Sequence, residues 1–113
     1  MIDERSIVAR LKDARLYAEN LRQIISETTE TLAGRDYLAT RYCLVVIGGT
    51  LGKVPSEVLA GESEIPWRSI IGLRYRLVHA YWLIDADIVS EIARHETAPL
   101  IAALDRIIAG IEP

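Results

Sequence analysis

Residues 3–34 read DERSIVARLKDARLYAENLRQIISETTETLAG and carry a strictly periodic apolar pattern. Apolar or small residues recur there in alternating steps of four and three, at Ile7, Leu11, Ala14, Ala18, Leu21, Ile25, Thr28 and Leu32. A seven-residue repeat of this kind marks one face of a long helix that packs against other helices. The spacing predicts a helix from Asp3 to Leu32, with Asp3 as N-cap and Gly34 as stop signal. The same face would also suit the pairing of subunits.

The pattern continues downstream with a second predicted helix over residues 36–51. Its packing face is predicted from residues that again step by four and three, namely Leu38, Tyr42, Val45, Gly49 and Gly52. Glycines on such a face let two helix backbones approach closely. Pro55 interrupts the pattern, and residues 61–66 are predicted to form a loop.

The last part of the chain predicts two or three more helices. The third helix follows Pro66, a residue suited to a first helical turn, and carries an apolar face at Trp67, Ile70, Leu73, Leu77 and Val78. A fourth, capped by Asp85 or Asp87, is expected to end near Arg94, and Thr97 would cap a fifth. Because no alternating strand pattern occurs, the prediction is a single all-α domain over residues 1–113, a bundle of four or five helices.

Composition narrows the functional class. The 113 residues are half hydrophobic and suit one compact domain. The net charge of −3 argues against a histone-like or repressor-like nucleic-acid binder, although a local basic site is compatible with it. The longest uncharged stretch, residues 42–52, is too short for a membrane helix, and the charged N-terminus is unlike a secretory signal. With Cys43 as the single cysteine, we expect a cytoplasmic protein.

Metal and nucleotide motifs are not found. Gly48 to Lys53 resembles a phosphate-binding loop, but the spacing is one residue short and no strand precedes it. Cys43, His79 and His95 do not pair at metal-binding spacing. We therefore expect neither a metal nor a cofactor.

Residues 67–85 contain the densest group of chemically active side chains, namely Arg68, Arg74, Arg76, His79, Tyr81 and Asp85. Arg74 and His79 lie five residues apart, about 140° around an ideal helix. They would converge only through the long arginine side chain, a distorted helix or a second subunit. A histidine can take a proton from a ribose 2′-hydroxyl or return one to a leaving 5′-oxygen, and an arginine can hold the phosphate. The residue types alone leave open that His79 is instead a core or interface residue.

The run from Gly72 through Arg74 and His79 to Tyr81 resembles the signature of HEPN-domain toxins of the HepT family. That signature is an arginine, four intervening residues, a histidine, one further residue and a tyrosine. Residues 65–68 resemble the Pro-Trp approach to the same helix, while 84–85 and 88–89 resemble the segment after the tyrosine. Ile47-Gly48 resembles an earlier Ile-Gly-Glu-Ala element. The similarity covers about residues 35–105.

The resemblance implies a HEPN-like helical domain that forms a homodimer and acts as the toxin of a type VII toxin–antitoxin system. Arg74 and His79 would be the catalytic pair of a metal-independent endoribonuclease at the dimer interface. Tyr81 would be the hydroxyl that a minimal nucleotidyltransferase antitoxin of the MntA type modifies with AMP. Arg76, Arg68 and Tyr75 are candidates for RNA contacts.

The sequence departs from the family pattern in two places, and these departures keep alternatives open. Tyr75 stands where the family commonly has asparagine, and Gly49-Thr50 stands where it has Glu-Ala. One alternative is a non-catalytic module that binds a nucleotidyltransferase or a nucleotide. Another is a purely structural bundle. Asp85 is expected either to cap a helix or to orient His79 or Tyr81.

Overall fold

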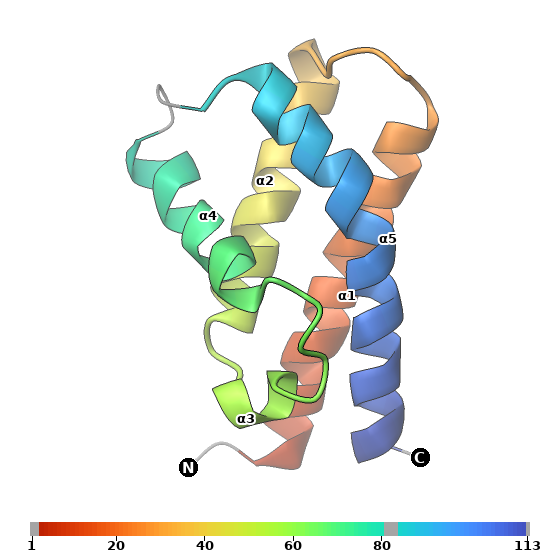
Figure 1. The fold of residues 1–113 in the computed structure, drawn as a ribbon, viewed down its shortest axis with the longest axis vertical. Coiled ribbons are helices and arrows are strands. Elements are labelled where there is room, and N and C mark those ends of the chain that lie inside the picture. Colours follow the sequence, from red (N-terminus) through yellow and green to blue (C-terminus); the bar gives the residue numbers. More distant parts are fainter. Residues whose placement is uncertain (1–2, 81–83, 113) are drawn as a thin grey trace.

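The structure, a computed structural model, describes residues 3–80 and 84–112. These residues contain four long helices and one single-turn helix (Figure 1). They are α1 (Glu4–Ser26), α2 (Gly34–Leu51), α3 (Ser56–Leu59), α4 (Trp67–His79) and α5 (Ala86–Ile111). No strand occurs among the described residues. The predicted all-α bundle is confirmed.

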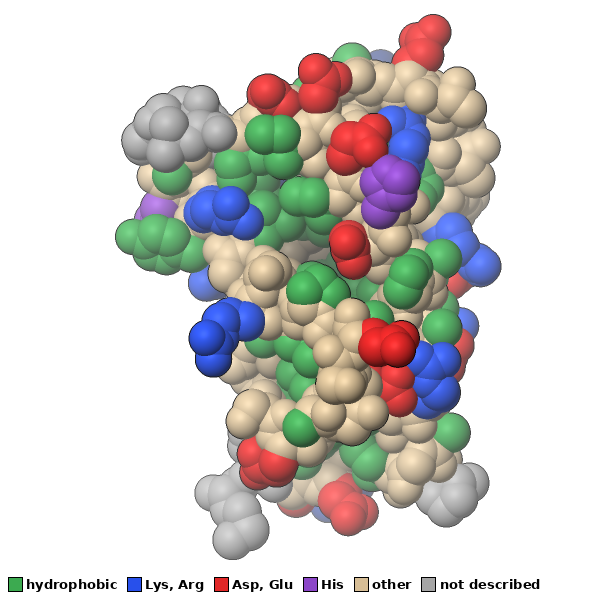
Figure 2. Space-filling model, in the orientation of Figure 1, with side chains coloured by type: hydrophobic (Ala, Val, Ile, Leu, Met, Phe, Trp, Pro, Cys, Tyr) green, Lys and Arg blue, Asp and Glu red, His purple; other side chains and the backbone are tan. Residues whose placement is uncertain are grey.

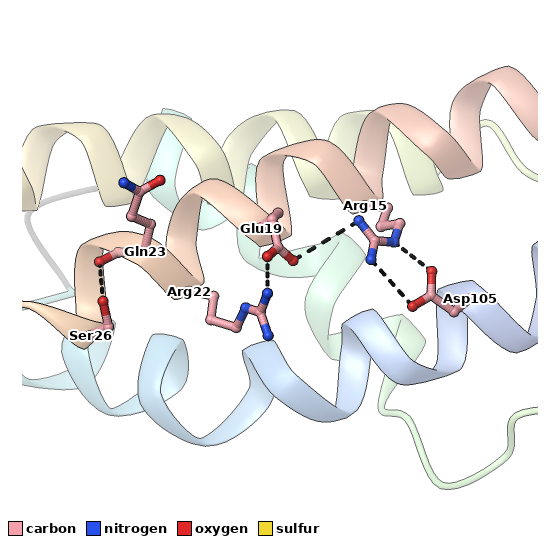
Figure 3. A network of polar contacts seen from close by, with 6 residues as sticks. All are labelled: Arg15, Glu19, Arg22, Gln23, Ser26 and Asp105. Atoms are coloured by element: carbon pink, nitrogen blue, oxygen red, sulfur yellow. Dashed lines mark hydrogen bonds and ion pairs between the residues drawn. The ribbon is translucent and has the colours of Figure 1, made fainter.

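Helix α1 packs against both α2 and α5, and α2 lies between α1 and α4 (Figure 1). Leu11, Ala14, Ala18 and Leu21 are at most 1% exposed, so the predicted apolar face of α1 is confirmed over these residues. The face is buried within this chain and is not available to a second subunit. Polar side chains clamp α1 to α5 at the rim of the core, where Arg15 pairs with both Asp105 and Glu19 (Figure 3).

The beginning of α1 is as predicted, but its end is not. Asp3 is the N-cap, and its carboxylate accepts a hydrogen bond from the Ser6 amide at 2.8 Å. The helix stops at Ser26, because the polar segment 27–33 is held by side chains of α5 instead of by helical hydrogen bonds. Arg94 donates to the carbonyl of Thr28, and the Leu32 amide donates to the buried Ser90 hydroxyl at 2.8 Å. Gly34 adopts a φ of 56° and opens α2, so its prediction as the stop signal is wrong.

The two predicted C-terminal helices are one continuous helix, α5. Asp85 caps it by accepting a hydrogen bond from the Ile88 amide at 2.9 Å. Thr97 is not a cap: it is buried, and its hydroxyl donates to the Ala93 carbonyl one turn earlier. Pro99 lies inside the helix and removes one backbone hydrogen bond, a loss of roughly 3 kcal/mol or more. Burial of the apolar residues that follow it against α1 offsets this loss.

Helix α2 turns a different face to the core than the sequence predicted. Leu38 and Tyr42, expected on the packing face, are each 61% exposed. The buried face consists of Thr40, Cys43, Leu44, Ile47, Gly48 and Leu51. Both faces of α2 are apolar, so periodicity alone does not decide between them, and the face with the larger set of bulky residues is buried. Leu38 and Tyr42 of the predicted stripe therefore lie on the outside of the molecule, whereas Val45 packs against the core and Gly49 and Gly52 face α4.

Gly48 is the point of closest approach between α2 and α4. A Cβ atom added there would lie 2.8 Å from the Cβ of Arg74 and 3.1 Å from the Ile70 carbonyl oxygen. Neither atom is the end of a flexible side chain, so any larger residue would push the two helices apart.

Gly48→Ala should therefore destabilise the protein by roughly 1–3 kcal/mol through overpacking, despite the better helix propensity of alanine. Gly72→Ala is the matched control, because a Cβ at Gly72 in α4 meets nothing within 4 Å. That control should gain up to about 1 kcal/mol. Chemical denaturation of both variants measures the difference, and equal stability of the two would contradict the proposed close contact.

Candidate functional site

Helix α4 carries the candidate residues and is fixed at both ends. Ile70, Leu73 and Leu77 form its buried face. Near its start, the indole N–H of Trp67 donates to the Glu62 carbonyl at 3.0 Å. At its end, Arg41 of α2 donates from Nη2 to the Leu77 carbonyl at 2.9 Å. The outer face of α4 is therefore presented on a rigid support.

All the candidate residues of α4 lie on its exposed surface. They are Arg68, Arg74, Tyr75, Arg76 and His79. The exposure of His79 rules out a role in the core of this chain. Figure 2 shows Lys and Arg side chains both along the edge formed by α4 and on the side of α1 and α5, and acidic side chains lie next to those on the α1 and α5 side. The acidic chain thus has a local basic region.

Arg74 and His79 do not form a compact pair on one helix. α4 is a continuous α-helix up to His79, so the two residues are about 140° apart around its axis and ~7.5 Å apart along it. On an ideal helix, Val78 and Tyr75 lie between them, and these side chains are 46% and 64% exposed. The Tyr75 ring contacts the His79 ring, with centroids 4.6 Å apart and planes at 40°. A distorted helix is therefore excluded as the means by which Arg74 and His79 could converge.

The Arg74 side chain lies over α2. Its Nε would be 3.1 Å from a Cβ at Gly49, so the absence of a side chain at Gly49 makes room for it. Beside it is a cavity of about 480 Å³, lined by Arg10, Val45, Val46, Gly48, Gly49, Thr50, Gly52, Lys53, Ile71 and Arg74. His79 is not among the lining residues. Sequence reasoning missed Arg10, which is remote from the α4 signature, and considered Lys53 only in the resemblance of residues 48–53 to a phosphate-binding loop, which it rejected.

The remaining candidates are placed as follows. Asp85 is the N-cap of α5. Tyr81 lies outside the described residues.

Within residues 3–80 and 84–112, no three His, Cys, Asp or Glu side chains gather as metal ligands. Burial raises the pKa of the Cys43 thiol, which makes it a poorer nucleophile. In the same part of the chain, no helix combines the length and apolar character needed to cross a membrane.

Comparison with known proteins identifies the family. A family model described as Ribonuclease HepT-like matches residues 14–107. The chain belongs to the HepT-like ribonuclease family. This membership confirms the resemblance drawn from residues 72–81. No solved structure gives a significant match to the chain.

Three archaeal proteins illustrate the similarity of this HepT-like chain to individual relatives. Two proteins of Methanocaldococcus jannaschii, both provisionally named RNases, are 33% and 31% identical over 70 residues, or 62% of the chain. The chain spans only 58% and 60% of their lengths. A Thermococcus cleftensis protein, provisionally named ribonuclease HepT, is 23% identical over 75% of the chain and 84% of its own length.

Proposed function

We propose that this protein is a metal-independent endoribonuclease toxin in which Arg74 and His79 act at a dimer interface. The observation that carries the proposal is the exposure of both residues on α4 of a HepT-like ribonuclease family member, separated by an apolar surface. A compact pair within one chain would need no partner. Two residues on different sides of one helix are suited to a site completed by a second copy.

The proposed chemistry needs only protein groups. His79 takes the proton of a ribose 2′-hydroxyl, and the 2′-oxygen forms a bond to the adjacent phosphorus. The bond from phosphorus to the 5′-oxygen breaks, and the leaving oxygen receives a proton, from the second subunit's histidine in a two-fold dimer. The products are a 2′,3′-cyclic phosphate and a free 5′-hydroxyl. The Arg74 guanidinium holds the phosphate and stabilises the negative charge that develops on it.

Cleavage should therefore occur in the presence of EDTA and fall at least about 100-fold in His79→Ala, which lacks the general acid–base group. Arg74→Lys should also be impaired, since lysine cannot form the bidentate phosphate contact. His95→Ala is the matched control, because the chain's other histidine lies exposed on α5 and pairs with Glu91. Product analysis of a labelled RNA measures the rate of cleavage by all three variants. Equal cleavage by the His79 and His95 variants would refute the assignment.

The dimer is proposed from the outer surface of α2 and α4. Leu38 and Tyr42 on α2, together with Tyr75 and Val78 on α4, are large apolar side chains left exposed on neighbouring helices. The Tyr42 ring also contacts the Tyr17 ring edge to face, with centroids 6.0 Å apart, which extends this surface to α1. A second copy that covers it would remove apolar area from water, and it would stand beside both Arg74 and His79.

Leu38→Glu is expected to convert the dimer to a monomer, because it places a charge in the proposed interface. Ile88→Glu is the control: Ile88 is 48% exposed, but it belongs to α5. Light scattering after size-exclusion chromatography measures the mass, and RNA cleavage should be lost together with the dimer. A monomeric wild-type protein, or dissociation by Ile88→Glu alone, would argue against this surface.

Regulation by a nucleotidyltransferase antitoxin is the second part of the proposal, and it rests on the position of Tyr81 in the signature. Transfer of AMP from ATP to the Tyr81 oxygen would release pyrophosphate and add a negative charge two residues from His79. That charge would repel an RNA backbone and obstruct the site.

Incubation with such an enzyme and ATP should therefore add the mass of AMP to the wild type but not to Tyr81→Phe, and should abolish cleavage by the wild type only. Tyr75→Phe is the control for an exposed tyrosine on α4. Intact-mass spectrometry reports the modification. Addition to Tyr81→Phe, or loss of the mass shift in Tyr75→Phe alone, would place the modification elsewhere.

A second candidate function is a non-catalytic module that binds a nucleotidyltransferase. The contact of Tyr75 with His79 favours it, because the tyrosine ring covers one side of the imidazole. In that case the wild type would cleave no RNA and His79→Ala would bind the partner normally. Recovery of cleavage in Tyr75→Asn would identify the tyrosine as the cause of inactivity in the wild type.

A further inference from the structure

The cavity beside Arg74 is lined by cations from three separate parts of the chain. Arg10 comes from α1, Lys53 from the turn after α2, and Arg74 from α4. No aspartate or glutamate lines the cavity. In a chain with 16 acidic and 13 basic side chains, three converging cations without an acid form a strongly positive site.

These three cations have no counter-charge within the described residues. None of them forms an ion pair there, and the half-buried Arg10 keeps its Nε buried without a hydrogen-bond partner. Three other cations of α1 are paired. Arg15 pairs with Asp105 and Arg22 with Glu19 (Figure 3), and Lys12 pairs with Glu112. Because unpaired cationic groups held near one another repel, an anion in the cavity would be stabilised by the two guanidinium groups and the ammonium group together.

The walls of the cavity indicate which anion fits. A volume of about 480 Å³ accommodates a phosphate with an attached sugar. Among the described residues, the lining contains the Thr50 hydroxyl and aliphatic side chains but no aromatic ring on which a base could stack. Gly49 and Gly52 leave the α2 wall without side chains there. The contacts available are therefore those to a phosphodiester backbone, which are independent of base sequence.

Resting on the proposed ribonuclease function, we propose that this cavity binds an RNA backbone phosphate next to the one that is cleaved, with Arg10 and Lys53 as binding residues. Arg74 is shared between the cavity and the candidate catalytic residues, whereas His79 is not part of the lining. Arg10 and Lys53 therefore position the strand and take no part in bond cleavage.

The test measures the binding of a labelled, fully 2′-O-methylated RNA, which lacks the 2′-hydroxyl needed for cleavage, at several salt concentrations. Arg10→Gln and Lys53→Gln should each weaken binding roughly 3- to 10-fold. Each should also reduce the slope of log affinity against log salt by roughly 0.7, the value for one phosphate contact on a single strand. In cleavage assays, both should raise KM and leave kcat within about twofold.

Matched controls exist for both charges. Arg5→Gln removes an arginine from α1 outside the cavity, and Lys12→Gln removes the chain's only other lysine. Neither should change the salt slope. Because Arg10 is half-buried, thermal unfolding checks its variant, and the exposed Lys53 gives an independent reading that does not depend on packing.

The outcomes separate this proposal from the nuclease proposal. Wild-type cleavage with unchanged binding in Arg10→Gln and Lys53→Gln would overturn the phosphate site only. Weakened binding in these variants, with no cleavage of unmodified RNA by the wild type, would support the site and reject the nuclease. Loss of 5′-AMP binding in the double variant, with RNA binding unchanged, would overturn the RNA assignment in favour of a free nucleotide.

Discussion

The contact of α2 with α4 at Gly48 determines how the candidate residues are presented. Since the Cβ of Arg74 and the Ile70 carbonyl occupy the space where a Gly48 side chain would be, the two backbones lie unusually close. This closeness allows Arg41 to reach the Leu77 carbonyl and brings the Arg74 side chain over Gly49. A larger residue at position 48 would disturb the end of α4, the placement of Arg74 and the adjacent cavity together.

The distribution of charge divides the molecule into two parts with different roles. Between α1 and α5, cations meet carboxylates and hold the two long helices together, as for Arg15 with Asp105 (Figure 3). Between α1, α2 and α4, cations line a cavity that has no acid. The net charge of −3 therefore averages over regions of different charge, because no aspartate or glutamate is among the described residues that line the cavity of Arg10, Lys53 and Arg74.

Much of the fold follows from the sequence, and the predictions that were wrong share one physical origin. The periodicity of α1 and the caps Asp3 and Asp85 act through local geometry, so they are visible in the sequence. Which face of α2 is buried is not visible in the sequence, since both of its faces are apolar and only packing against α1 and α4 selects between them. Likewise, Thr97 before Pro99 looks like a helix start, but a long partner helix keeps α5 continuous through the proline.

The candidate site shows the same division between local and tertiary information. The α4 residues could be identified from their spacing in one helix, whereas Arg10 and Lys53 join Arg74 only through the packing of three elements.

The exposed apolar residues of α4 link the proposed dimer to the proposed site. Val78 and Tyr75 lie between Arg74 and His79 on α4. A protein surface that covers these two apolar side chains therefore also lies next to Arg74 and His79. In a two-fold assembly the same surface of the partner would face them, bringing a second arginine and histidine. Burial of apolar area and completion of the proposed site would then be one event, which would make activity depend on the concentration of protein.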